Sequence, residues 1–182
     1  HIAVIQRNAL QSWLRLAPAC EIFLCGDEAG VEETAKEFGV RHLGGLERTS
    51  YGTPLISSAF DRVRAAASHP LLCYVNADII FLQDLIKAAR RISLENFLLA
   101  GQRWDMDIRA PIGFRWPFWA LWLRARRRLT ARLHRPVGSD YFLFPRNAFE
   151  KLPDFAVGRA GWDNWLMHHA GLMNYPLVDA TE

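Results

Sequence analysis

An asparagine and an aspartate follow the apolar run LLCYV, residues 71–75, directly at its end: Asn76 and Asp78. A carboxylate placed where a buried strand ends is held rigidly, and it can bind a hard cation such as Mg²⁺ or Mn²⁺ that bridges phosphate oxygens. Because Asn76 and Asp78 are two residues apart, both side chains can project to the same side. The alternative interpretation is a plain turn, since Asn and Asp are favoured turn residues.

A second acidic residue lies in the segment GRAGWDNWL, residues 158–166. Its two glycines flank a turn, and Asp163 enters the first turn of an expected helix with Trp162 and Trp165 beside it. An acid in that position commonly does no more than stabilise the helix N-terminus. Two further pairs of candidates lie in other segments: Trp104 with Asp105, and Asp140 with Tyr141. Both pairs could contact a ligand. The alternative is that the first pair forms a hinge and the second anchors the start of a strand.

These residues need a sheet to position them, and the apolar patterns predict one. Short apolar runs alternate with segments of helical periodicity, which indicates an α/β fold with a mostly parallel sheet. In open α/β sheets, ligands bind beyond the carboxyl ends of the strands. We expect strands at 21–25, 40–43, 71–75, 97–100, 140–144 and 176–182, and helices at 2–16, 31–38, 53–63 and 162–170, with a helix start at Thr53-Pro54. We expect another helix between residues 82 and 97, and a short one between residues 144 and 158.

Charge is unevenly distributed along the 182 residues, which fit one domain. The net charge is +3, but residues 108–139 contain eight arginines and no acid. Guanidinium groups suit planar recognition of phosphate. The aromatic and basic stretch 115–135 has three interpretations: a segment lying on an anionic membrane surface, a grip on diphosphate or nucleic acid, or a helix whose aromatic face covers the domain.

Cysteine usage and hydropathy bear on the compartment. The three cysteines form no CxxC pair, and Cys25 and Cys73 lie in apolar runs, where a thiol is expected to be buried; this favours a reducing compartment and argues against structural zinc. The longest apolar run, residues 116–123, is far below the ~20 residues that cross a bilayer. We expect a cytoplasmic protein, with membrane association through 115–135 as one open interpretation.

Several motifs, in their order along the chain, resemble family-2-like glycosyltransferases of the GT-A fold from bacteria. VNADIIF is similar to their DxD-type motif with Asn76 in place of the first Asp. IQRNALQSWL, a strand that ends in Gly-Asp, GTPL, GSDYFLFPR and GRAGWDNWL are the other matching segments, so that the resemblance spans nearly the whole chain.

The resemblance implies a three-layer α/β/α, Rossmann-like domain over residues 1–182, continuing beyond both ends, that transfers a sugar from a nucleotide-diphosphate donor to an acceptor hydroxyl. It implies Asp163 as the general base, Asp78 as the ligand of Mn²⁺ or Mg²⁺, and an unidentified glycan or lipid-linked acceptor. The expected donor contacts are Arg7, Asn8, Gly26, Asp27, Asn76 and Asp78. The expected acceptor contacts are Trp104, Asp105, Asp140, Tyr141 and Trp162.

Two alternative functions stay open. A nucleotidyltransferase that makes the sugar nucleotide would use a similar sheet, although no Gly-rich, basic phosphate loop is visible. A non-catalytic glycan- or nucleotide-binding domain is favoured by the asparagine at position 76. Signatures of other enzyme classes (GxGxxG, GxxxxGK[ST], GxSxG, HExxH) are missing from the sequence, and we expect no nucleic-acid partner.

Overall fold

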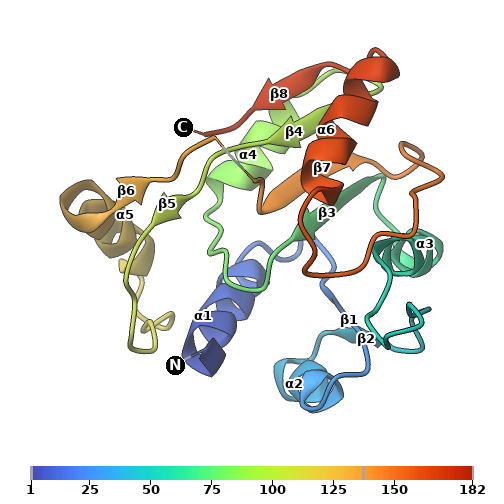
Figure 1. The fold of residues 1–182 in the computed structure, drawn as a ribbon. Coiled ribbons are helices and arrows are strands. Elements are labelled where there is room, and N and C mark those ends of the chain that lie inside the picture. The colour runs from blue at the N-terminus through green and yellow to red at the C-terminus, as the bar shows by residue number, and fades with distance from the viewer. Residues whose placement is uncertain (1, 137, 182) are drawn as a thin grey trace.

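A computed structural model describes residues 2–136 and 138–181 of the chain (Figure 1). The helices are α1 (Ile2–Leu14), α2 (Val31–Phe38), α3 (Ile56–Ala66), α4 (Asp84–Arg91), α5 (Trp119–Thr130) and α6 (Trp162–Leu172). The strands are β1 (Phe23–Cys25), β2 (Arg41–Leu43), β3 (Leu71–Val75), β4 (Leu98–Ala100), β5 (Trp104–Asp105), β6 (Arg132–Leu133), β7 (Tyr141–Pro145) and β8 (Leu177–Asp179).

The main sheet has four strands in the order β3-β7-β4-β8. Strand β7 is antiparallel to both of its neighbours, with Val75 opposite Tyr141 and Leu99 opposite Leu143. Strands β4 and β8 are parallel. The sheet is therefore mixed, whereas the sequence patterns predicted a mostly parallel one. Periodicity identifies a strand but not its direction, and β3, β4 and β8 run one way while β7 runs the other.

Two small sheets accompany the main one. Strands β1 and β2 form a parallel pair of three residues each, to which α2 is attached. Strands β5 and β6 form a short antiparallel pair on either side of α5. In the ribbon, α5 and this pair lie at one side of the molecule, and α2 with β1 and β2 lies on another (Figure 1).

Helices cover both faces of the main sheet. Alternate residues of β7 supply the two cores: Phe142 and Phe144 pack with α3 and α6, and Tyr141 and Leu143 pack with α1 and α4. This alternation is the period of two expected of a strand buried on both faces. The structure thus has helices packed on each side of the sheet, and the α/β class is confirmed.

Most predicted elements are present, with three local corrections. The short helix expected between residues 144 and 158 is not formed; this segment has turns and a single bridge instead, and Pro145 and Pro153 lack the N–H that a helix needs. Helix α3 begins at Ile56 after an extended Leu55, so Thr53 and Pro54 are not its N-cap and first residue. Pro54 instead bridges to Arg48 in the preceding loop, which takes this part of the chain out of the helix. Cys73, expected to be buried, is exposed; it lies in the edge strand β3, which pairs with β7 alone among the described residues.

In the part of the chain that the structure describes, no helix has the length and apolar character required to span a membrane.

Candidate functional site

The direction of β7 brings three polar side chains to one edge of the main sheet. Asn76 follows β3, Arg103 follows β4, and Asp140 precedes β7. Because β7 is antiparallel to both neighbours, its beginning lies beside the ends of β3 and β4. The backbone N–H of Asn76 donates to the carbonyl of Asp140 at 2.8 Å, which fixes this junction.

A chain of hydrogen bonds joins the side chains at this edge. The Tyr74 hydroxyl donates to Asn76 Oδ1 at 3.1 Å, and Asn76 Nδ2 donates to Asp140 Oδ1 at 2.9 Å. Arg103 Nη1 donates to the other oxygen of Asp140, whose side chain is only 14% exposed. The partners on both sides fix the orientation of the Asn76 amide.

The acidic candidates act on the ionisation of Tyr74. Burial, followed by the negative charges of Asp140, Asp163 and Asp78, raises the pKa of Tyr74 to about 12. The hydroxyl therefore stays protonated near neutral pH and remains a hydrogen-bond donor to Asn76. Three of the residues predicted from separate segments thus lie close enough to one hydroxyl to act on it electrostatically.

The hairpin of β5 and β6 adds a second set of polar contacts. Arg103 Nε donates to Asp105 Oδ1 at 2.8 Å, and His134 Nδ1 lies 2.7 Å from Asp105 Oδ2. Hydrogen bonds from Arg103 and then His134 hold the pKa of Asp105 below its usual range. Arg103 connects Asp105 with Asp140, and the sequence patterns identified neither Arg103 nor His134. Their contact depends on the antiparallel return of β6 after α5, for which the sequence carries no local signal.

Asp163 lies in the first turn of α6, where Gly161 adopts φ 108°. Its Oδ2 accepts a hydrogen bond from the backbone N–H of Ser139 at 3.3 Å, just ahead of β7. Gly138 has φ 74°, and a Cβ on it would lie 3.4 Å from the same oxygen. Asp163 is half-buried. Within residues 2–136 and 138–181, its Oδ1 makes no hydrogen bond or ion pair.

Two of the three aromatic residues predicted to contact an acceptor lie in the core. Trp162 is 7% exposed, and its ring meets the Tyr74 ring edge-on with centroids 4.5 Å apart. Tyr141 is also buried, and its hydroxyl donates to the carbonyl of Ala180. Trp104, by contrast, is partly exposed, with the Arg127 guanidinium 4.8 Å from its ring centroid.

Asp78 is exposed at the end of β3, and no described side chain or backbone group binds its carboxylate. Among the described residues, no three His, Cys, Asp or Glu side chains are grouped so that they could hold a metal ion. The protein groups present do not by themselves form a metal site. A divalent cation at Asp78 would need oxygen ligands from water and a bound phosphate, as Mg²⁺ commonly does.

Gly26 and Asp27 hold a separate junction at the ends of β1 and β2. Asp27 Oδ2 accepts a hydrogen bond from the Gly45 N–H at 2.7 Å, and a His42 ring nitrogen lies 2.7 Å from the Gly26 carbonyl oxygen. A Cβ at Gly44 would approach Asp27 Oδ1 to 2.2 Å, so a larger residue there would displace the Asp27 side chain from this position. Asp27 therefore orders the loop after β2 in this structure.

The predicted donor contacts on α1 are engaged in contacts within the protein. Asn8 is 2% exposed; its Nδ2 donates to the Ala110 carbonyl at 3.1 Å, and its Oδ1 accepts from the Ile112 N–H at 2.9 Å. Arg7 is paired with Glu37 and lies over the Phe38 ring at the end of α2. No described contact connects Arg7 or Asn8 with Asp78 or Asp163.

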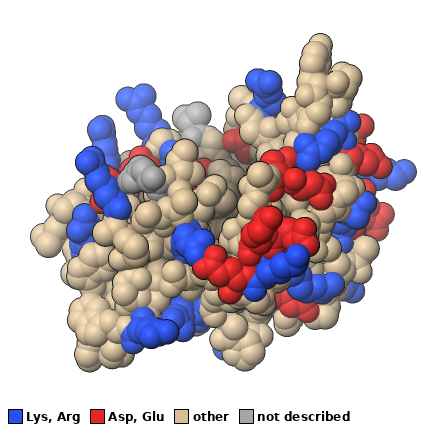
Figure 2. Space-filling model, turned by 90° about the horizontal axis from the view of Figure 1, so that it is seen from below, with Lys and Arg blue, Asp and Glu red and all other residues tan. Residues whose placement is uncertain are grey.

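Charge differs across the face seen from below the ribbon (Figure 2). On this face acidic side chains gather, together with basic ones, on the side of α2 and α3, and the side of α5 shows mainly basic side chains among uncharged surface (Figure 2). The arginine-rich segment that the sequence identified is therefore also a distinct region of the surface.

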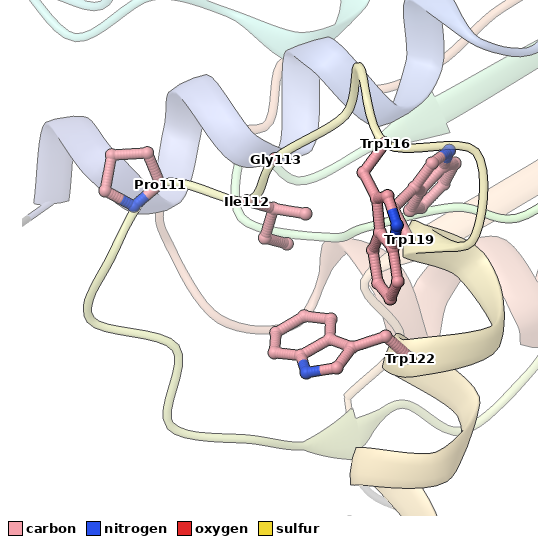
Figure 3. A pocket seen from close by; sticks show the side chains of 6 residues that line it. All are labelled: Pro111, Ile112, Gly113, Trp116, Trp119 and Trp122. Carbon is pink, nitrogen blue, oxygen red and sulfur yellow. The ribbon is translucent and has the colours of Figure 1, made fainter.

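Tryptophan side chains from the segment before α5 and from α5 itself line a surface cavity of about 220 Å³ (Figure 3). Its walls are Pro111, Ile112, Gly113, Trp116, Trp119 and Trp122. A second cavity, of about 550 Å³, lies between α3 and the segment 150–154. Neither is lined by the acidic residues at the sheet edge.

Comparison of the chain with protein-family models, with curated proteins and with solved structures finds no match.

Proposed function

We propose that the chain is a GT-A-like glycosyltransferase domain that moves a sugar from a nucleotide-diphosphate donor to an acceptor hydroxyl at the edge formed by β3, β4 and β7. One observation carries the proposal: Asp140 and Asp163 are hydrogen-bonded at the sheet edge around Asn76 and Ser139, and they and Asp78 lie near enough to the Tyr74 hydroxyl for their charges to raise its pKa. Transfer to a hydroxyl needs a proton acceptor and groups that orient two substrates, and carboxylates placed together can divide these roles.

The three carboxylates have different surroundings, which supports different roles. Asp140 is committed to Asn76 and Arg103 and therefore acts as a positioning residue. Asp163 is anchored through Oδ2 to Ser139, and its Oδ1 is the atom that we assign to proton transfer. Asp78 is exposed and faces the donor side of the edge in this proposal.

The proposed reaction is a single displacement. Asp163 takes the proton of the acceptor hydroxyl, the acceptor oxygen bonds to the anomeric carbon, and the bond from that carbon to the diphosphate oxygen breaks. Mn²⁺ or Mg²⁺, shared between Asp78 and the donor, would offset charge on the departing diphosphate. Gly26 and Asp27 border the nucleoside in this proposal, and Trp104 with Asp105 offers an exposed surface to the acceptor.

Donor binding is tested by thermal denaturation with UDP-, GDP- and dTDP-sugars, each with and without Mn²⁺. A donor at 100 times its Kd stabilises the native state by about 2.7 kcal/mol. We expect one nucleotide to raise the Tm, and Asp78→Asn to reduce the Mn²⁺-dependent part of that rise. If no nucleotide sugar stabilises the protein, the proposal fails; stabilisation that is indifferent to Mn²⁺ removes the metal from it.

The base is tested with Asp163→Asn, which keeps an oxygen for the Ser139 N–H but cannot take a proton near neutral pH. We expect turnover to fall by at least about 100-fold while the donor-induced Tm shift remains, because general-base catalysis contributes about 10²–10⁴. Glu33→Gln, an exposed change in α2, is the control for loss of one carboxylate. Unchanged turnover in Asp163→Asn would remove this residue from the mechanism.

A second candidate is a non-catalytic nucleotide- or glycan-binding domain of the same fold. The specific observation in its favour is Asn76, a neutral residue whose amide is held on both sides by Tyr74 and Asp140. This candidate predicts a ligand-induced Tm shift without turnover of any donor, and Asp163→Asn would then change neither result.

A further inference from the structure

Helix α5 presents an apolar stripe to solvent. Phe118, Leu121, Trp122, Ala125 and Leu129 are spaced by three or four residues, which places them along one side of a helix. All five are exposed: Leu129 is 84%, Leu121 63% and Phe118 57% exposed. The pattern of a core-facing helix is thus present, but its apolar side points away from the protein.

The other side of the helix already holds it in place. Leu123 is buried with Ile112 and Phe114, and Trp119 packs against that same small cluster. The Trp119 and Phe114 rings lie with their centroids 4.8 Å apart. The fold therefore does not need the exposed stripe for its own core. This differs from the covering helix considered from the sequence, in which the aromatic side faced the domain.

Arginines flank the stripe and continue beyond it. Arg126 lies beside Trp122, 5.6 Å from its ring centroid, and Arg124 pairs with Asp84. Five further guanidinium groups make no ion pair with any acidic residue in the described part of the chain: Arg115, Arg127, Arg128, Arg132 and Arg135. The view from below shows this side of the molecule as mainly basic and uncharged surface (Figure 2).

The tryptophans extend the stripe toward the preceding segment. Trp116 is 51% exposed, and Figure 3 shows it with Trp119 and Trp122 around the cavity that Pro111 and Ile112 complete. A tryptophan combines a large apolar ring with one N–H donor and suits the boundary between headgroups and acyl chains. The surface therefore has three kinds of group side by side: apolar side chains, tryptophans suited to the boundary between headgroups and acyl chains, and cationic guanidinium groups.

We propose that this face of α5 docks on an anionic lipid bilayer, with the stripe buried among the headgroups and upper acyl chains and the arginines on lipid phosphates. A helix with an apolar side and flanking cations binds a bilayer in this way, through buried area together with electrostatic attraction. The charge favours a bilayer over a second copy of the chain, because two copies would bring the same uncompensated arginines together. The inference does not rest on the proposed function.

The experiment is co-sedimentation of the complete chain with vesicles of phosphatidylcholine alone or with 30% phosphatidylglycerol. We expect binding to the anionic vesicles, weakened by added salt. Leu121→Ser with Leu129→Ser should reduce binding by at least about tenfold, since both apolar side chains leave the bilayer. Arg128→Gln with Arg132→Gln should reduce it by about fivefold for each charge.

Matched controls change the same residue types elsewhere on the surface. Leu172→Ser removes an exposed leucine from α6, and Arg90→Gln with Arg91→Gln removes two exposed arginines from α4. Both should bind like the unchanged chain. Circular dichroism checks that each variant is folded, and quenching of the unchanged protein's fluorescence by brominated anionic lipids tests tryptophan insertion without any substitution.

Three outcomes would overturn the proposal: equal binding to neutral and anionic vesicles, equal losses in the α5 and control variants, or no quenching by brominated lipid. A concentration-dependent dimer that Leu121→Ser with Leu129→Ser dissociates, together with no vesicle binding, would assign the stripe to a second copy instead. Lack of sugar transfer would not affect any of these results, so the two proposals fail separately.

Discussion

At the scale of single residues, Asn76 has the most constrained position at the sheet edge. Its Nδ2 donates a hydrogen bond to Asp140 at 2.9 Å, and its Oδ1 accepts one from the Tyr74 hydroxyl. The amide donor thus faces an acceptor, and the amide acceptor faces a donor. A carboxylate cannot make both contacts, because it has no N–H to offer Asp140. The asparagine that looked in sequence like a weakened metal ligand is, in the structure, the residue that fits between a hydroxyl and a carboxylate.

Asn76→Asp is therefore expected to destabilise the protein, although it restores the two-acid spacing of a DxD-type motif. It replaces a hydrogen bond by repulsion between two carboxylates, one of them largely buried, and we expect a cost of about 1–3 kcal/mol in the free energy of unfolding. Urea denaturation at pH 7 measures it. Asn164→Asp, on the exposed side of α6, is the control and should lie within about 0.5 kcal/mol of the unchanged protein.

At the scale of elements, the sequence predicted the existence and position of most strands and helices. Strand β3 was predicted at its exact bounds, and α2 ends before Gly39, which adopts φ 65° as a C-terminal glycine should. Strand direction was not predictable, since alternating apolar residues look the same in both directions. For that reason Asn76 and Asp140 were identified as separate candidates, whereas their contact and the role of Arg103 appeared only once β7 was seen to be antiparallel.

Helix α1 is joined to the rest of the protein through Asn8, whose amide binds the backbone at Ala110 and Ile112. Asn8→Ala should destabilise the protein by about 1–3 kcal/mol, because the buried Ile112 N–H and the part-buried Ala110 carbonyl lose their partner. Differential scanning calorimetry would show a lower Tm. Gln11→Ala, on the same helix but half-buried and without a described hydrogen bond, is the matched control. If Asn8→Ala and Gln11→Ala lowered the Tm equally, the role of the Asn8 amide in joining α1 to the rest of the protein would be contradicted.

At the scale of the whole molecule, the core excludes the charged forms of several weak acids. Burial raises the pKa of Tyr74 and of Tyr141 from 10.0 to about 12, and that of Cys25 from 9.0 to about 11. The unfolded chain releases these protons at lower pH than the native chain does. The stability that these three groups contribute is therefore fully present below about pH 9 and is lost as the pH rises toward 12.

This predicts a protein that is sensitive to alkali. The urea midpoint should fall between pH 8 and pH 10.5, and it should fall less in Tyr141→Phe, which removes one of the titrating groups. The difference in urea midpoint between the unchanged protein and Tyr141→Phe should therefore be smaller at pH 10.5 than at pH 8. A midpoint that does not change over this range would show that the phenols and the thiol ionise equally well in the folded state.

The separation of β1 and β2 from the four-stranded sheet has a consequence for the order in which the protein opens. Each of those strands has three residues and one partner, whereas Leu99 and Leu143 pair at the centre of the main sheet and are almost completely buried. Amide protons of β1 and β2 should exchange with deuterium through local opening, long before those of β4 and β7, which require global unfolding. The loop that Asp27 orders would then loosen while the edge around Asn76 is still intact.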